Sequence, residues 1–191
     1  MTLRNTPHIL ELSTRLQAVR KELRQALAET ARADVGEYVF QTPDGPLTLK
    51  SLFGDKRDLF VVHNMGKGCN SCSMWADGLN GFYPHIADRA VLVVASPDSP
   101  AVQAEFAASR GWRFPMVSTM GTSFSADMGF ATAAGGPMPG VSAFQMKGGQ
   151  VVRVSASPFD DFDEFCLAWR LFDLLPEGAN GWRPQRNYET A

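Results

Sequence analysis

The chain has 191 residues, of which 45% are hydrophobic and 20% charged, and its formal net charge is −2 at pH 7. These values are typical of a soluble globular protein with one well-cored domain, and they argue against nucleic acid or an anionic membrane surface as the main partner. No apolar run approaches the roughly 20 residues of a membrane span, and no apolar signal-peptide region follows Met1. Three cysteines are too few for a secreted disulfide framework, so we expect a cytoplasmic protein.

Residues 1–34 predict an N-terminal helical arm. Thr6-Pro7 suits a helix start, and no further Gly or Pro occurs before residue 36. Apolar residues alternate three and four positions apart, as in a coiled-coil seam: Ile9, Leu12, Leu16, Val19, Leu23 and Ala26. We expect a homodimer through this helix; the alternative is a helix that lies across its own domain.

Residues 35–176 predict a domain in which strands alternate with helices. Strands are expected at 37–41, 47–49, 59–63, 91–95 and 114–118, and helices over 101–110 and from about 70, with a break near Gly78 and Gly81. After a Gly/Ala/Ser/Pro-rich loop, two strands joined by Lys147-Gly-Gly predict a hairpin, and a last helix is expected from Asp160 to about Leu174. Residues 177–191 predict a loose C-terminal tail. The alternation implies parallel strands with crossover helices, which is an α/β fold.

The strongest chemical signal is the pair Cys69 and Cys72, which follows an apolar strand and a glycine-rich turn and opens a helix. A helix N-terminus offers unpaired N–H groups and partial positive charge, and both favour a thiolate over a thiol. Cys69 lies nearest this end, so its thiolate is expected to be stabilised more than that of Cys72. A Cys-x-x-Cys in a βα setting is typical of a dithiol/disulfide site.

The chain resembles the thioredoxin-like family catalogued as domain of unknown function 899 over roughly residues 10–175. The matching segments are Glu37-Tyr-Val-Phe, Asp44-Gly-Pro-Leu-Thr-Leu-Lys-Ser-Leu-Phe, Gly68-Cys-Asn-Ser-Cys-Ser-Met-Trp-Ala-Asp-Gly, Gly111-Trp-Arg-Phe-Pro-Met-Val-Ser and Pro139-Gly-Val-Ser-Ala-Phe. The resemblance implies a thioredoxin-like fold: a central mixed sheet flanked by helices, here with the N-terminal arm. It implies little about the substrate.

Compared with thioredoxins, the predicted site departs at several positions. His63 stands where thioredoxins carry a buried Asp, so it is a candidate proton carrier for Cys72; the alternative is a hydrogen bond to backbone at the strand end. Lys67 is either a charge that stabilises the Cys69 thiolate or a solvated side chain. Asn70 and Ser71 replace Gly-Pro between the cysteines and make the loop more polar.

The segment before the hairpin departs too. Val141 occupies the position of the thioredoxin cis-proline, and Pro139 lies two residues earlier, so either Pro139 serves in its place or that contact is absent. Peroxiredoxins need a Thr or Ser three residues before the reactive cysteine and an Arg before a later strand. Here those positions hold Gly66 and Val141, which makes a thiol peroxidase the minor alternative.

Three further residues have a structural and a chemical interpretation. Trp75 shares a helical face with Cys72 and is expected in the core. Asp77 either bonds local backbone or places a carboxylate near the site. Cys166 lies among aromatic residues and is expected to be an inert buried thiol. Cys69, Cys72 and His63 lack further ligands nearby in sequence, so we expect no metal and no other cofactor.

The sequence therefore predicts a dithiol/disulfide oxidoreductase with Cys69, Cys72 and His63 as catalytic residues. Lys67, Asn70, Ser71, Trp75, Asp77, Pro139 and Val141 are the residues expected to line the site. Its partners would be a disulfide-containing substrate or small thiol and a reductant protein. The alternative is a non-enzymatic interaction module or redox sensor that keeps the fold.

Overall fold

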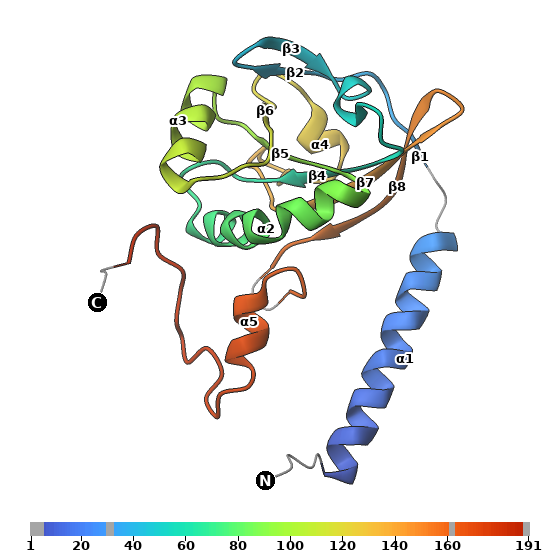
Figure 1. Cartoon of the computed structure of the whole chain (residues 1–191), viewed down its shortest axis with the longest axis vertical. Helices are drawn as coiled ribbons and strands as arrows, with labels where there is room; N and C mark the ends of the chain where they lie inside the picture. The colour runs from blue at the N-terminus through green and yellow to red at the C-terminus, as the bar shows by residue number, and fades with distance from the viewer. Residues whose placement is uncertain (1–5, 30–32, 161–162, 189–191) are drawn as a thin grey trace.

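The computed structural model describes residues 6–29, 33–160 and 163–188. Along the chain lie α1 (Pro7–Glu29), β1 (Ala33–Asp34), β2 (Val39–Thr42), β3 (Gly45–Thr48), η1 (Ser51–Phe53), β4 (Asp58–His63), α2 (Asn70–Arg89), β5 (Val91–Ser96), α3 (Pro100–Arg110), β6 (Met116–Ser118), α4 (Phe124–Asp127), β7 (Gly140–Lys147), β8 (Gln150–Pro158) and α5 (Leu167–Phe172). Figure 1 shows the strands gathered in one body, with α1 extending away from it. Among these helices, none is both long and apolar enough to cross a membrane.

The strands form a single mixed sheet in the order β1-β8-β7-β4-β5-β6-β2-β3. Its centre is β4, which pairs in parallel with β5 and antiparallel with β7. β5 also pairs in parallel with β6, whereas β7 and β8 form the predicted antiparallel hairpin. The predicted α/β architecture with a mixed sheet and flanking helices is therefore confirmed.

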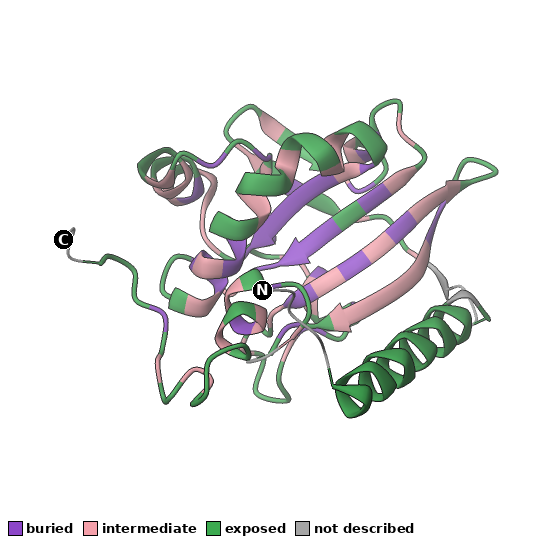
Figure 2. Ribbon diagram, turned by 60° about the horizontal axis from the view of Figure 1, so that its bottom comes forward, coloured by how far each residue is buried: buried purple, intermediate pink, exposed green. Residues whose placement is uncertain are grey.

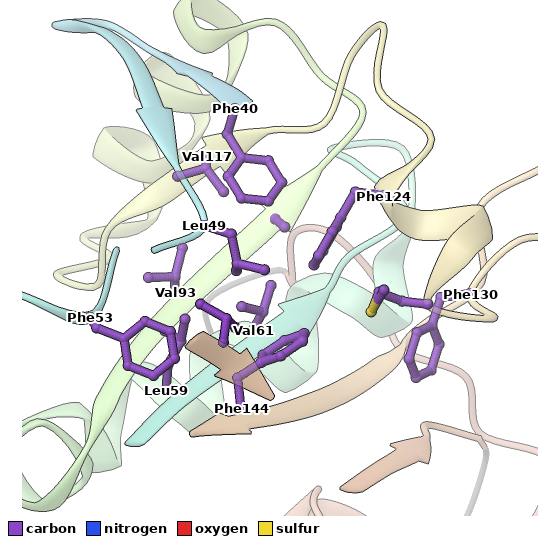
Figure 3. Packing of buried hydrophobic residues seen from close by; sticks show 13 residues of the cluster. Phe40, Leu49, Phe53, Leu59, Val61, Val93, Val117, Phe124, Phe130 and Phe144 are labelled. Carbon is purple, nitrogen blue, oxygen red and sulfur yellow. The ribbon is translucent and has the colours of Figure 1, made fainter. Parts of the chain in front are cut away.

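Two hydrophobic clusters cover the two faces of this sheet, and residues along β4 and β5 alternate between them. The α4 cluster comprises Phe40, Leu49, Phe53, Leu59, Val61, Val93, Ala95, Val117, Phe124, Met128, Phe130, Phe144 and Val151 (Figure 3). The α2 cluster comprises Val62, Cys72, Trp75, Ala76, Leu92, Val94, Trp112, Phe114, Phe159, Cys166 and Trp169. From Val61 to His63, β4 is buried on both faces, whereas Phe60 is exposed; the strand has a continuous apolar run from Leu59 to Val62.

Helix α1 begins as predicted, since the Thr6 hydroxyl accepts a hydrogen bond from the Ile9 N–H at 3.3 Å. The apolar seam of this helix is open to solvent in the single chain: Ile9, Leu12, Leu16, Val19 and Leu23 are each 45–59% exposed. Figure 2 shows the whole helix as exposed. An ion pair between Arg20 and Glu164 links this helix to the segment before α5. The predicted dimer remains a prediction.

Three local predictions were wrong. α2 runs unbroken through Gly78 and Gly81, because the face with Cys72, Trp75 and Ala76 is buried and this packing outweighs the weak helix propensity of glycine.

The last helix was expected from Asp160, yet α5 begins at Leu167; residues 161–162 lie outside the described chain. The Asp163 carboxylate accepts hydrogen bonds from the N–H groups of Phe165 and Cys166, and this turn shapes the segment before the helix.

The C-terminal tail is not loose over its described part. Trp182 packs edge-on against Trp169 and Phe172, with ring centroids 5.6 and 5.0 Å apart. Tyr188 stacks on Trp182 in turn, at 6.5 Å and an interplanar angle of 6°. The tail therefore extends the α2 cluster.

Candidate active site at the N-terminus of helix α2

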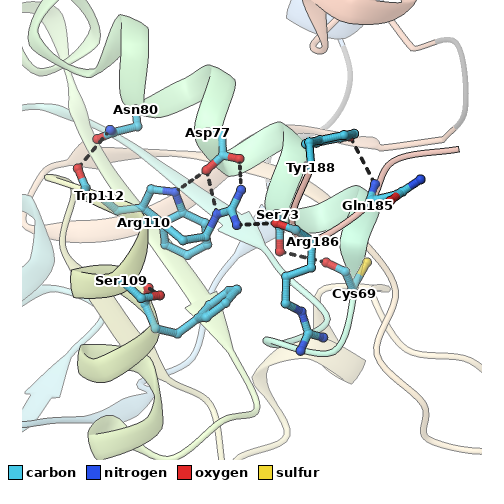
Figure 4. Close-up of polar contacts among 12 residues, drawn as sticks. Cys69, Ser73, Asp77, Asn80, Ser109, Arg110, Trp112, Gln185, Arg186 and Tyr188 are labelled. Atoms are coloured by element: carbon cyan, nitrogen blue, oxygen red, sulfur yellow. Dashed lines mark hydrogen bonds and ion pairs between the residues drawn. The ribbon is translucent and has the colours of Figure 1, made fainter. Parts of the chain in front are cut away.

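Cys69 and Cys72 lie together in the first turn of α2. Cys69 is the N-cap residue of this helix, with extended backbone angles, and its sulfur accepts a hydrogen bond from the Cys72 N–H at 3.1 Å. The Ser73 hydroxyl donates to the Cys69 carbonyl at 3.0 Å, which helps to fix this turn (Figure 4). Cys69 is partly exposed, whereas Cys72 is buried, and all three cysteines are free thiols. The accessible sulfur is thus the one at the helix end.

The pKa values of the two thiols are shifted in opposite directions. A hydrogen bond from the Cys72 thiol lowers the pKa of Cys69 to about 7, against the effect of burial, and the backbone N–H groups of Cys72 and Ser71 add to the shift. The same hydrogen bond and burial raise the pKa of Cys72 far above its ordinary value, although the Met65 N–H donates to its sulfur at 3.5 Å. Around pH 7 a large fraction of Cys69 is therefore thiolate, whereas Cys72 remains a thiol.

The loop that leads to Cys69 is held by two side chains that sequence reasoning missed. The Asn64 side-chain oxygen accepts from the Gly66 N–H at 2.8 Å, and an Asp98 carboxylate oxygen accepts from the Lys67 N–H at 2.7 Å. Gly66 has φ +100°, and a Cβ there would lie 3.0 Å from the Asp98 carboxylate. Glycine is required at this position by both conformation and space.

His63 does not fit the role of a proton carrier. Its ring stacks between Phe130 and Phe124, at centroid distances of 4.0 and 5.4 Å, and its Nε2 is hydrogen-bonded to the Ser142 hydroxyl at 2.9 Å. Burial, with a contribution from the charge of Arg153, lowers the pKa of His63 to about 3. The imidazole is therefore neutral near pH 7.

The His63 ring is also separated from the thiols by the sheet. Along β4, Leu59, Val61 and His63 face the α4 cluster, whereas Val62 faces the α2 cluster that contains Cys72. His63 and Cys72 thus lie on opposite faces of the sheet, and the expected proton transfer between them is not supported.

Asp77 joins three segments instead of facing the thiols. One of its oxygens accepts from the Trp112 indole N–H at 2.8 Å, and its carboxylate forms an ion pair with Arg110. Arg110 also donates to the backbone carbonyl of Arg186 at 2.9 Å. Figure 4 shows this chain of contacts, which links α2, the end of α3 and the C-terminal tail.

Of the other predicted lining residues, some pack against the α2 cluster and the others lie at the surface. Trp75 is buried in the α2 cluster with Cys72, as expected, and its ring lies 4.9 Å from that of Phe159. Val141 packs against the same cluster and pairs with Val62 in the sheet. Lys67 and Asn70 are exposed, and Ser71 is partly exposed.

Pro139 does not act as a cis-proline, since the described chain contains no cis peptide bond. Its carbonyl oxygen accepts from the Phe159 N–H at 3.1 Å. Cys166 is buried, and burial raises the pKa of its thiol, which favours the protonated form expected of an unreactive cysteine. No group of three or more potential metal ligands occurs among residues 6–29, 33–160 and 163–188.

Solved structures with the same arrangement place the chain among proteins with a thioredoxin-like fold, which confirms the predicted fold class. Peroxidoxin BcpB from Mycobacterium tuberculosis is 22% identical, with a TM-score of 0.54 over 66% of this chain and 83% of that chain. AhpC from Enterococcus faecalis is 12% identical, with a TM-score of 0.55 over 68% and 80%. The bacterioferritin comigratory protein of Xanthomonas campestris is 18% identical, with a TM-score of 0.53 over 63% and 80%.

The particular family follows from the sequence model that matches residues 10–190. The chain belongs to the family described as bacterial protein of unknown function (DUF899). Among curated proteins, none matches this chain.

Proposed function

We propose that this protein is a thiol–disulfide oxidoreductase in which Cys69 is the nucleophile and Cys72 the resolving thiol. The observation that carries the proposal is that the pKa values of two cysteines in one helical turn are shifted in opposite directions. The pKa of Cys69 is lowered to about 7 and its sulfur is partly exposed, whereas Cys72 is buried and keeps its proton. A thiolate at ambient pH is close to the optimum for attack on a disulfide.

In the first step, the Cys69 thiolate attacks one sulfur of the substrate disulfide. A bond forms between that sulfur and Cys69, the substrate S–S bond breaks, and the leaving thiolate takes a proton from solvent. The Cys72 N–H and the Cys72 thiol hold the Cys69 sulfur in place at the start of this step.

In the second step, Cys72 attacks the Cys69 sulfur of the mixed disulfide. The hydrogen bond to the Cys69 thiolate is the largest cause of the raised pKa of Cys72, followed by burial, and this hydrogen bond is weakened once Cys69 is bonded to the substrate and has lost its charge. The Cys72 proton can then pass to the departing substrate thiolate, and no protein base is needed, consistent with the position of His63. The substrate gains two electrons, Cys69 and Cys72 form a disulfide, and a protein or small-molecule dithiol reduces it again.

Alkylation of the thiols as a function of pH tests the proposal. We expect the rate with iodoacetamide to follow a midpoint near pH 7 that Cys69→Ser removes and Cys166→Ser leaves unchanged. Cys72→Ser should accumulate a mixed disulfide that is visible by mass spectrometry, because the resolving thiol is absent. An alkylation midpoint near that of a free thiol, about 8.5, would refute the assignment of Cys69.

The solved structures favour a thiol peroxidase as a second candidate, since those named above include a peroxidoxin. Cys69 is acidic enough for peroxide chemistry. However, Gly66 and Val141 stand where peroxiredoxins carry a hydroxyl and a guanidinium. We therefore expect peroxide consumption by the reduced protein no faster than by a free thiol of the same pKa, and a much faster reaction in stopped flow would favour this candidate.

We further propose that the protein is cytoplasmic and that it forms a homodimer through α1. The exposed seam of this helix supports the dimer, because Leu16, Val19 and Leu23 remain in water in the single chain. Sedimentation equilibrium should give twice the chain mass at high concentration, and Leu16→Glu should give the single mass; a single mass for the unmodified protein would exclude the dimer.

A further inference from the structure

A groove of about 390 Å³ lies beside the loop that leads to Cys69. α3 supplies one wall, with Glu105, Phe106 and Arg110; Lys67 comes from the loop, and Arg186 comes from the C-terminal tail. Lys67 is two residues from Cys69 in the chain. The groove therefore borders the loop that leads to the reactive Cys69.

The groove carries an excess of positive charge. Arg110 is neutralised by its ion pair with Asp77. For the side chains of Lys67 and Arg186, the described part of the chain provides no ion-pair partner. Among the lining residues, the two cations outnumber the one carboxylate, that of Glu105, around a space large enough for a small organic molecule. The Asp98 carboxylate is not a lining residue, but it accepts a hydrogen bond from the Lys67 N–H at 2.7 Å.

Arg186 is held in position by contacts on each side of it. Arg110 donates a hydrogen bond to its carbonyl oxygen at 2.9 Å. The Tyr188 hydroxyl accepts from the Gln185 N–H at 3.1 Å, and the Tyr188 ring stacks on Trp182, which is anchored in the α2 cluster. The tail thus presents the guanidinium to the groove from a fixed backbone, which reduces the entropy lost when a ligand binds.

We infer that this groove binds the carboxylate of a small anionic disulfide or thiol, and that Lys67 and Arg186 determine this specificity. The inference rests on the proposed function, since it names the substrate class of the same site. A guanidinium and an ammonium are the side chains that pair with carboxylates. The bound carboxylate would hold the substrate sulfur near Cys69, and the exchange then proceeds as described above.

Three small disulfides of similar size but different charge test the inference: dithiodipropionate, hydroxyethyl disulfide and cystamine, which are anionic, neutral and cationic. The reduced protein is mixed with each, and the loss of free Cys69 is followed by quenched alkylation and mass spectrometry. The proteins compared are the unmodified chain, the double variant Lys67→Ala/Arg186→Ala, and Lys147→Ala, which removes a cation at the distant β7–β8 hairpin.

We expect the double variant to lower the ratio of the anion rate to the neutral rate roughly 10-fold, as is typical when a steering charge is removed. The anion rate of the unmodified protein should also fall as salt is added. Lys147→Ala should behave like the unmodified protein.

Equal slowing of the double variant with all three disulfides would overturn the inference, because it would mean that the two cations act on Cys69 itself. An anion rate that neither the variant nor salt changes would overturn it as well. If the unmodified protein reacts with hydroxyethyl disulfide no faster than a free thiol, the proposed function fails, and this result is distinct from a loss of charge discrimination.

Discussion

The stability of the reduced protein should rise between about pH 7 and about pH 9 because Cys69 ionises earlier in the folded than in the unfolded state. The pKa of Cys69 falls from 9.0 to about 7 on folding. In this window the folded protein has released the Cys69 proton and the unfolded chain has not. Stability rises with pH wherever the unfolded state binds more protons, so Cys69 contributes stability above its unfolded pKa that is lost as pH falls through 7.

One proton difference is equivalent to about 1.4 kcal/mol per pH unit, which gives about 2.7 kcal/mol over the window as an upper bound. Cys69 is partly exposed, so solvent screening reduces this to about 1–2 kcal/mol. Above about pH 9 the sign reverses. The unfolded chain then loses the protons of Cys72 and Cys166, which the folded protein retains because their pKa values are raised.

Urea unfolding under reducing conditions, followed by tryptophan fluorescence at a series of pH values, measures this curve. Cys69→Ser should flatten the rise between about pH 7 and about pH 9. Cys166→Ala is the matched control: it should lower stability at every pH, because it leaves a small cavity, but keep the slope in this window. A flat curve for the unmodified protein, or an equal rise in Cys69→Ser, would refute the reasoning.

Three further outcomes follow from contacts of the site. The unmodified protein should lose about 2–3 kcal/mol of unfolding free energy between about pH 6.5 and about pH 4.5, because the unfolded chain protonates His63 in this range and the folded protein, with a His63 pKa of about 3, does not. His63→Gln should remove this loss. Urea unfolding of both proteins at a series of pH values measures it, and an equal loss in the variant would contradict the prediction. Asp77→Ala should cost about 2–4 kcal/mol in urea unfolding, because it leaves an indole N–H and Arg110 without their acceptor; a loss below about 0.5 kcal/mol would mean that water replaces the carboxylate. Gly66→Ala should lower the free energy of unfolding by about 1–3 kcal/mol and slow Cys69 alkylation. Gly68→Ala, where an added Cβ meets nothing within 4 Å, should change neither quantity much. Equal effects at the two positions would contradict the conclusion that the loop requires glycine at position 66.

The thiol pair was predictable because its signals are local. An apolar strand, a glycine-rich turn and the start of a helix lie next to one another in the chain, and each has a sequence pattern of its own. The position of Cys69 at the helix end follows from these patterns alone. Local signals failed where packing competes with them, as in α2, which continues through Gly78 and Gly81.

The orientation of His63 was not predictable for a related reason. The second half of β4 is buried on both faces, so its sequence lacks the alternation of apolar and polar residues that would show which face each side chain occupies. Only the assembled sheet shows that the imidazole faces Phe124 and Phe130.

Contacts between distant segments were beyond sequence reasoning as well. Asp98 lies 31 residues after Lys67, and Arg186 lies 76 residues after Arg110. No periodicity or motif connects such positions. Asp98 belongs to a Ser-Pro-Asp-Ser-Pro segment, whose composition indicates only a turn and a helix start.

The docked tail has a practical consequence for how this protein is handled. A shortened chain that ends after α5 would keep the sheet, α2 and both thiols, yet it would lack Trp182 and Arg186 and so one side of the groove. An affinity tag on the C-terminal side would be attached to the same segment that supplies Arg186 to the groove. Removable tags at the N-terminus are therefore the better choice for measuring substrate preference, and a truncated protein that still reduces generic disulfides would report on the thiols but not on their selectivity.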